Sequence, residues 1–393
     1  MTDYNGNKVK LDMGTVTDVD TVGLIVYLAG CVVNQTVPEI QETDIPDLDK
    51  VYKRASRHMM SEIVATGLEK AGFADQRSSK ELGRARHRAI LFENSWKEVS
   101  EKFEEAGINY LPLKGLVVKQ YYPGIGLREM SDHDVLINPS RAEDVKNIME
   151  GLGYTTDQFD KTSHDVYFKE PVLNYEIHKR LFGISCGNAI YEYYRDVNRF
   201  FQGEGCRHAF SAEDFYVYMI AHEYKHYITK GTGLRSLLDT YVYLKHVPLD
   251  MEYVKGEIQK LGLSDFEELN RSLANNLFSG EKLSDTEAQM LKYVVTSGTY
   301  GTKTHRIQNQ VNRHGGRAQY IKDRLIAPIS KNNPRYDAFA KKFPVFYKYK
   351  ILLPFLPFYR IINALGSGKL SLETKALKKY TNEKNPLTKS EDT

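Results

Sequence analysis

Around residue 107 the spacing of apolar residues changes from a helical period to short β-type runs. Upstream, across 44–106, apolar residues recur every three or four positions, which predicts helices; examples are Ile90, Leu91, Trp96, Val99 and Phe103. Downstream, β-type runs cover 108–113, 134–137, 154–156, 164–169 and 173–178, and helices are expected over 116–121 and 141–152. Residues 107–180 are therefore expected to form an α/β or α+β unit.

Helical patterns dominate the rest of the chain. Ser211 precedes an acidic first turn and is expected to cap a helix, which Gly231 and Gly233 separate from a second helix over 234–245. The apolar stretch Val22 to Val33 is too short to cross a bilayer and predicts a core helix. We predict four regions: a mainly helical one over 1–106, the core unit over 107–185, a helical domain over 186–330, and a basic, aromatic-rich region over 331–393.

Charge is distributed unevenly along the 393 residues, although the formal net charge is only +3. Residues 301–393 contain 19 Lys and Arg against 6 Asp and Glu, a net +13, so residues 1–300 carry a net −10. A basic segment on an acidic body favours an anionic partner such as a phospholipid surface, nucleic acid or a polyphosphorylated carrier. Solvated lysines on a helical region would give the same pattern.

Aromatic and basic residues alternate between Lys342 and Gly366, and the prolines there exclude one continuous helix. Such a mixture suits an anionic membrane surface, but it is also compatible with packing into the helical domain. No RRM or helix-turn-helix signature accompanies the basic region, so no specific nucleic acid is predicted.

The cysteines and the first residues predict a cytoplasmic protein, which the segment 342–366 could hold at the inner membrane face. Cys31, Cys186 and Cys206 form no CxxC pair, which fits a reducing compartment. Met1 to Lys10 has neither the basic nor the apolar region of a secretion signal. A composition of 41% hydrophobic and 27% charged residues excludes a wholly disordered chain.

The segment Ser131-Asp-His-Asp-Val-Leu-Ile137 carries the clearest chemical signal. On a strand, Asp132 and Asp134 point to one face and His133 to the other. Two carboxylates in one small volume repel each other unless a cation lies between them, and oxygen ligands suit Mg²⁺ or Mn²⁺. A solvated pair at a strand end is the alternative.

Two further segments can join this pair. In Asn174-Tyr-Glu-Ile-His178, Glu176 and His178 share a strand face, and Glu176 would complete a three-carboxylate cluster if the two strands are neighbours. Leu113-Lys-Gly115 lies at an expected strand-to-helix turn, where Gly115 would let backbone N–H groups approach a phosphate and Lys114 would add charge.

Taken in order, these segments resemble the uncharacterised bacterial nucleotidyltransferase family of the polymerase-β-like superfamily. The chain has Leu113-Lys-Gly115, then Leu127-Arg-Glu-Met-Ser-Asp-His-Asp-Val-Leu-Ile137, then Tyr175-Glu-Ile-His178, where the family has LKG, RxMxDxDxLV and ExH. The likeness continues through 221–226 and 233–239, so it covers about 107–245. It implies an α+β fold: a minimal nucleotidyltransferase mixed sheet flanked by helices, with N-terminal helices and a C-terminal helical domain.

The resemblance also implies roles for individual residues. Asp132, Asp134 and Glu176 would be the catalytic, metal-binding carboxylates, and Lys114, Gly115 and Arg128 would bind the phosphates of a nucleoside triphosphate. Many relatives have Gly-Ser or Gly-Gly at the turn, whereas Leu116 follows Gly115 here, so Ser131 is expected to supply the hydroxyl.

A competing motif is His222-Glu-Tyr-Lys-His226, which satisfies the HExxH pattern of zinc peptidases. Lys225 would place a positive charge inside such a site, and no third ligand is recognisable, so we do not favour it. His178, His222 and His226 are expected either to contact substrate or to be satisfied structural histidines. Arg235 and Asp239 are four residues apart, and a helix-face ion pair is preferred over a phosphate contact for Arg235.

We therefore expect a Mg²⁺- or Mn²⁺-dependent enzyme that transfers a nucleoside monophosphate from a nucleoside triphosphate to an unidentified acceptor hydroxyl. The alternative is a non-catalytic binding or scaffold protein on a membrane surface, built on the same fold. The sequence identifies neither the acceptor nor the base, and it does not indicate an oligomeric state.

Overall fold

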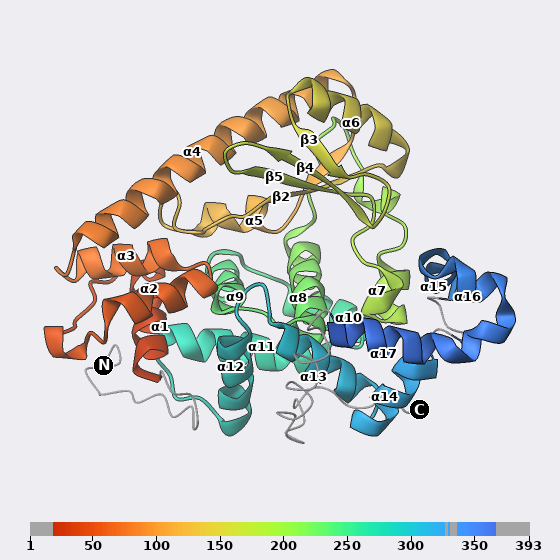
Figure 1. Cartoon of the computed structure of the whole chain (residues 1–393). Coiled ribbons are helices and arrows are strands. Elements are labelled where there is room, and N and C mark those ends of the chain that lie inside the picture. The colour runs from red at the N-terminus through yellow and green to blue at the C-terminus, as the bar shows by residue number, and fades with distance from the viewer. Residues whose placement is uncertain (1–18, 327–328, 331–335, 367–393) are drawn as a thin grey trace. The chain divides into compact units, whose positions relative to one another are not determined.

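A computed structural model describes residues 19–326, 329–330 and 336–366 (Figure 1). The sequence predicted that Met1 to Lys10 carry no secretion signal, and these residues lie outside the described range. Residues 331–335 and 367–393 of the basic C-terminal region lie outside it as well. Contacts divide the chain into two compact units. The first comprises 1–225 and 233–299, and the second comprises 226–232 and 300–393. The predicted division into four regions is finer than this and stays a prediction.

The first unit begins with four helices, α1 (Val19–Val33), α2 (Leu48–Arg57), α3 (Ser61–Lys70) and α4 (Gln76–Glu105). The helix predicted at 22–33 is α1, and its apolar side chains are buried. Helix α4 is 30 residues long, and the Asp75 carboxylate caps it by accepting from the backbone N–H of Ser78 at 2.6 Å. The helical spacing of 44–106 thus gave the correct structure.

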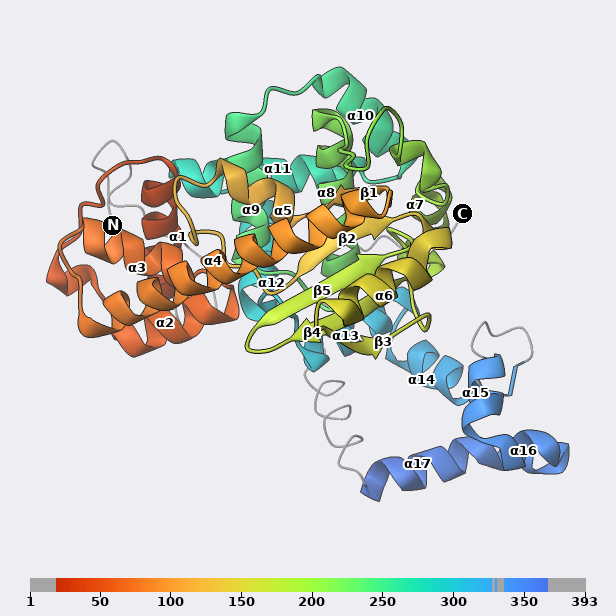
Figure 2. The ribbon, with the colours of Figure 1, turned by 90° about the horizontal axis from the view of Figure 1, so that it is seen from above.

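Five strands follow: β1 (Tyr110–Pro112), β2 (His133–Ile137), β3 (Thr155–Gln158), β4 (His164–Lys169) and β5 (Leu173–His178). They form one sheet in the order β1-β2-β5-β4-β3, in which β2 and β5 are parallel and the other pairs antiparallel (Figure 2). All five strands were predicted, and β4 and β5 have the predicted bounds. The mixed sheet with its helices confirms the α+β class.

Helices α4 and α6 (Ala142–Gly151) lie over one face of this sheet (Figure 2). The core between them and the sheet is largely aromatic and aliphatic, and its most buried members include Val99, Phe103, Val135, Tyr167 and Tyr175. The helix expected at 116–121 is a four-residue α5 (Gly115–Val118) followed by the 3₁₀ turn Lys119–Tyr121. Helix α5 contacts strand β2. The opposite face of the sheet carries the polar side chains described below.

The remaining helices of the first unit are α7 (Asn188–Tyr193), α8 (Ala212–Thr229, as far as Lys225), α9 (Leu234–His246), α10 (Met251–Lys260), α11 (Ser264–Ser279) and α12 (Asp285–Ser297). As predicted, Ser211 caps α8, because its Oγ accepts from the backbone N–H of Asp214 at 3.0 Å. Helices α9 and α11 contact each other and enclose a buried core that includes Leu237, Leu238 and Leu273.

The second unit contains α13 (Lys303–Arg313), α14 (Arg317–Ile326), α15 (Tyr336–Lys342), α16 (Pro344–Lys348), a 3₁₀ segment over Lys350–Phe355 and α17 (Leu356–Gly366). The prolines do break the helical path, as expected. Several large apolar side chains along this stretch are exposed, namely Val345, Tyr349, Ile351, Phe355, Phe358, Tyr359 and Ile362. Within the described residues, none of the helices has the length and apolar character needed to cross a membrane.

Candidate active site

Strands β2 and β5 bring three potential metal ligands together. The two strands are parallel neighbours in which Asp134 pairs with Glu176 and Leu136 with His178. One ligand atom from each of Asp134, Glu176 and His178 lies within 4.8 Å of the others. The expected adjacency of the two strands is therefore confirmed, and the sheet register places these groups on one face.

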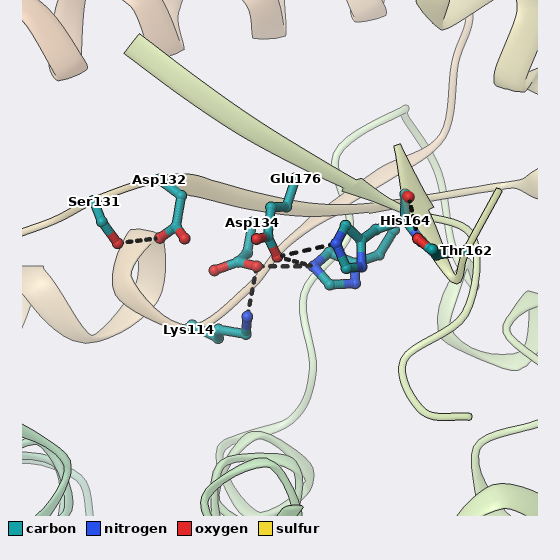
Figure 3. Close-up of polar contacts among 8 residues, drawn as sticks. Lys114, Ser131, Asp132, Asp134, Thr162, His164 and Glu176 are labelled. Atoms are coloured by element: carbon teal, nitrogen blue, oxygen red, sulfur yellow. Dashed lines mark hydrogen bonds and ion pairs between the residues drawn. The ribbon is translucent and has the colours of Figure 1, made fainter. Parts of the chain in front are cut away.

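Asp134 is the most heavily engaged of these groups (Figure 3). It is buried, and its Oδ1 lies 2.6 Å from Lys114 Nζ and 2.8 Å from His178 Nε2. Although burial opposes ionisation, Lys114 and His178 hold the pKa of Asp134 well below its usual range. The same pairing raises the pKa of the half-buried Lys114, with Asp132 and Glu176 adding to the effect, against the cost of burying its charge.

Glu176 lies beside two histidines. Its Oε2 is 3.7 Å from His178 Nε2 and 3.8 Å from His164 Nε2, and the two imidazole rings are 5.1 Å apart. Burial, together with the negative charge of Asp134, raises the pKa of Glu176 to about 7. Burial and the proximity of His178 lower the pKa of His164 to about 4, and burial also lowers the pKa of His178, so the neutral form of both rings is favoured.

Asp132 lies just before β2, on the same side of the chain as Asp134 (Figure 3). Burial and the charge of Asp134 raise its pKa. It is not among the three ligands that converge within 4.8 Å, and its Oδ1 accepts from Ser131 Oγ at 3.0 Å. The structure thus groups His178, rather than Asp132, most closely with Asp134 and Glu176. The Ser131 hydroxyl, which was predicted to bind phosphate, donates its hydrogen bond to Asp132.

The Lys114-Gly115 turn has an unusual backbone. Lys114 has φ +45° and ψ −115°, which a residue with a side chain rarely adopts and which costs about 1–3 kcal/mol. A Cβ on Gly115 would clash with Nη1 of Arg128 and press on the Met130 side chain. Glycine is therefore required here by the close approach of Arg128, whatever it contributes to phosphate binding.

Arg128 is itself bound by Asp239 of α9. Its Nε donates to Asp239 Oδ1 at 2.8 Å and its Nη2 to Oδ2 at 2.7 Å, and the Tyr122 hydroxyl donates to Oδ1 at 2.8 Å. Both charged side chains are almost fully buried. The preferred pairing of Arg235 with Asp239 is wrong, because Arg235 Nη1 donates to the carbonyl oxygen of Glu129 at 2.7 Å. Arg128, which is distant in sequence, is the partner of Asp239 in place of Arg235 on the same helix.

His133, which lies between Asp132 and Asp134, points to the opposite face of the sheet, as predicted. It is fully buried, and its ring lies 4.5 Å from that of Tyr175 and 4.6 Å from that of Phe92. Burial, and to a smaller extent Lys119, lower its pKa to about 3. His133 is thus a neutral core residue beneath α4.

The HExxH segment does not present its glutamate to a substrate. Glu223 is buried in the helical core, where its Oε2 accepts from Asn270 Nδ2 at 3.2 Å and from Thr240 Oγ1 at 3.5 Å. Burial raises its pKa to about 8. His222 is half-buried, with its ring 6.0 Å from that of Tyr218, and His226 belongs to the second unit. This environment contradicts the base role that a zinc peptidase requires of the glutamate.

Two residues near the carboxylates were missed by sequence reasoning. His164 pairs with His178 in the β4–β5 register, and the alternation of β4 could have indicated its face. Lys225 on α8 interacts electrostatically with Lys114, Asp134 and Glu176. Burial and the positive charge of Lys114 lower the pKa of Lys225. No local signal reveals Lys225, because its position depends on how α8 packs.

Residues 45–279 match the family model described as "Uncharacterised nucleotidyltransferase", which covers more than half of the chain. The chain belongs to this nucleotidyltransferase family. No curated protein matches it, and neither does any solved structure. The match contains the whole sheet, the candidate site and helices α8 to α11, so both Arg128 and its partner Asp239 lie within the matched region.

The donor set of this nucleotidyltransferase fits a divalent cation. Asp134 and Glu176 supply carboxylate oxygens and His178 a ring nitrogen, within the span that one ion can bridge. Burial and the negative charges of Asp134 and Asp132 raise the pKa of Glu176, and Lys114 only partly offsets them. A cation placed among these groups would relieve that repulsion.

Proposed function

We propose that the protein is a Mg²⁺- or Mn²⁺-dependent enzyme that transfers a nucleoside monophosphate from a nucleoside triphosphate to an acceptor hydroxyl. The acceptor oxygen bonds to the α-phosphorus, the bond to the β-phosphate breaks, and pyrophosphate and the hydroxyl proton are released. The observation that carries the proposal is the cluster of Asp134, Glu176 and His178 beside Lys114, in a chain of this family.

Asp134 and Glu176 would hold the cation, with His178 on the same face and Asp132 next to it. The bound ion would neutralise phosphate charge and lower the pKa of the acceptor hydroxyl. Lys114 pairs with Asp134, and its ammonium group would contact a phosphate of the bound triphosphate. His178 and His222 remain candidates for substrate contact.

The other predicted phosphate ligands have different support. Gly115 lies at the strained turn next to Lys114, where backbone N–H groups can approach a phosphate. Arg128 is bound to Asp239, so we propose that it acts by holding this turn in place. Ser131 and Arg235 are likewise engaged, with Asp132 and Glu129 respectively.

The test is thermal stability of the purified protein with each of the four nucleoside triphosphates, with and without Mg²⁺ or Mn²⁺. A ligand present at a hundred times its Kd adds about 2.7 kcal/mol and raises the melting temperature visibly. We expect a metal-dependent shift for the wild type and none for the Asp132→Ala/Asp134→Ala double variant. The exposed Glu143→Gln variant on α6 is the control and should behave like wild type. A double variant with full transfer activity would refute the proposal.

A second candidate function is attachment to an anionic membrane surface, with or without catalysis. The exposed apolar side chains of 345–362 favour it: Phe355 and Phe358 are 62% and 65% exposed, and Ile351 is 81% exposed. Exposed Lys342, Lys348 and Lys350 lie along the same stretch, in the part of the chain with net +13. Apolar insertion and attraction of lysines to acidic headgroups act together on such a surface.

Co-sedimentation with vesicles tests this attachment. We expect binding to vesicles containing phosphatidylglycerol, little binding to pure phosphatidylcholine, and loss of binding in the Phe355→Glu/Phe358→Glu variant. Val37→Glu is the matched control, because the Val37 side chain is likewise exposed, at 70%, and lies outside this stretch. Equal sedimentation of the double variant and the control would rule this surface out. A cytoplasmic location at the inner membrane face, and the bacterial origin, remain predictions.

A further inference from the structure

A cavity of about 350 Å³ lies where β2 and β5 begin. Glu129 and Met130 precede β2 and line one side, and 171–172 precede β5 and line another. The strands are parallel with His133 opposite Tyr175, so these two segments enter the sheet next to each other. Met130 is only two residues before Asp132, so one wall of the cavity belongs to the chain segment that leads into the carboxylates of the candidate active site.

The wall formed by α3 contains a carboxyl group with an unused acceptor. Glu62 is 8% exposed, and among the residues that the structure describes its Oε2 has no hydrogen-bond partner. The neighbouring Glu129 is better satisfied, because its Oε1 accepts from the backbone N–H groups of Ser61 and Glu62. Burial and the charge of Glu129 raise the pKa of Glu62 to about 9. A positive group between the two carboxyls would relieve this repulsion.

The wall formed by α4 contains an unused donor. Arg88 lies with its guanidinium 5.2 Å from the centre of the Phe92 ring, and its buried Nε has no acceptor within the described part of the chain. The other charged pair in the wall is satisfied, since Arg84 Nη1 is 3.4 Å from Glu81. Because the raised pKa keeps Glu62 protonated at neutral pH, the formal charges of Glu81 and Glu129 balance those of Arg84 and Arg88 in the lining, with His87 counted as neutral. The ammonium group of a ligand can displace the proton that Glu62 holds, and an oxygen beside it can accept from Arg88.

We propose that this cavity binds a small molecule that carries an ammonium group next to a hydroxyl group. The ammonium group donates to Glu62 and Glu129, and the hydroxyl oxygen accepts from Arg88 Nε. The identity of the acceptor rests on the proposed nucleotidyl transfer: if that reaction occurs, the acceptor is an amino alcohol, such as an amino sugar or a hydroxylated amino acid. Each unused polar atom in the wall then has a partner.

Binding is measured by calorimetry at pH 7, where both amines are protonated, on the full chain without nucleotide, with D-glucosamine and L-serine as probes and D-glucose as the uncharged match for the first. We expect at least one aminated probe to bind with a Kd of about 1 mM or tighter, and D-glucose not to bind. Glu62→Gln should weaken binding at least about tenfold, which is 1.4 kcal/mol. Glu69→Gln, on the exposed side of the same helix, should leave it unchanged.

Arg88→Met provides a second variant if Glu62→Gln unfolds, and it should also weaken binding. Equal binding of D-glucosamine and D-glucose, no binding of either aminated probe, or full binding by both cavity variants would overturn the inference. The Asp132→Asn variant separates the two proposals, because it should abolish nucleotidyl transfer and leave probe binding intact. Probe binding without any transfer by wild type would support the cavity and count against the proposed reaction.

Discussion

Arg128 and Asp239, which are 111 positions apart, are joined by two hydrogen bonds in which Nε and Nη2 of the guanidinium each donate to one carboxylate oxygen. This pair connects the segment before β2 to helix α9 and places Arg128 against Gly115. The LKG turn, the arginine before the aspartates and the aspartate of 233–239 are thus parts of one buried arrangement. In our proposal, this arrangement positions the turn that carries Lys114.

Removing one member of this pair should destabilise the fold strongly. Arg128→Ala or Asp239→Ala leaves a charge buried without its partner, which costs about 3–5 kcal/mol. Urea unfolding of the two single variants and of the double variant measures this, and the double variant should lose less than the sum of the two. If Arg128→Ala keeps wild-type stability but loses nucleotide affinity, the original assignment of Arg128 to phosphate binding would stand.

Gly115→Ala should also destabilise, by about 1–3 kcal/mol, because the added methyl group meets a guanidinium that Asp239 prevents from moving away. Gly83→Ala is the matched control, since nothing lies within 4 Å of its added Cβ in the middle of α4. That change should be neutral or stabilise by up to about 1 kcal/mol. Thermal unfolding gives both values. Equal effects of the two alanines would show that Arg128 does not restrict position 115.

Lys114→Met should change metal and nucleotide affinity in opposite directions. The ammonium group at 2.6 Å from Asp134 Oδ1 competes with a divalent cation for that oxygen, so Mn²⁺ alone should bind about tenfold more tightly to the variant. Nucleoside triphosphate in the presence of metal should bind about tenfold more weakly, because a phosphate contact is lost. Electron paramagnetic resonance of free Mn²⁺ and nucleotide titration measure the two. Lys161→Met, on an exposed turn, should change neither.

Glu223 should affect stability as a function of pH and should not affect catalysis. Its pKa is raised from 4.5 to about 8 by burial, so the folded state keeps a proton that the unfolded state releases. Stability from this group is fully present below pH 4.5 and is lost as the pH rises toward 8. Glu223→Gln should therefore gain stability relative to wild type between pH 5 and about pH 8, with nucleotide binding unchanged.

The same variant distinguishes the zinc-peptidase interpretation. The purified wild type should show no peptidase activity, with or without added zinc, because Glu223, which would have to act as the base, faces Thr240 and Asn270. Zinc bound at one ion per chain, together with a peptidase activity that Glu223→Gln abolishes, would contradict our assignment.

Local sequence was sufficient where the relevant interactions are local. The alternation of β-type runs predicted all five strands, and it predicted that Asp132 and Asp134 leave the chain on one side and His133 on the other. The switch from a period near 3.6 to a period of 2 depends only on which side chains face the core. The pairing of Glu176 with Asp134 required one assumption, that the two apolar strands are neighbours, and the β2–β5 register confirmed it.

Local reasoning was misleading for the charged side chains. Spacing on α9 favoured Arg235 as the partner of Asp239, but Arg128 reaches that carboxylate from a distant segment and Arg235 turns to the Glu129 carbonyl. Two neighbours four residues apart gain only about 0.2–0.5 kcal/mol on a helix surface, so a buried bidentate partner outweighs them.

The sequence by itself therefore determined the strands, the side of the sheet that carries the carboxylates, and the kind of chemistry they suit. Only the tertiary structure decided that Lys114 binds Asp134, that His164 and Lys225 join the site, and that Glu62 borders a cavity. The physical reason is distance along the chain. Periodicity reports which face a residue takes, whereas its partner depends on which elements the folded core places side by side.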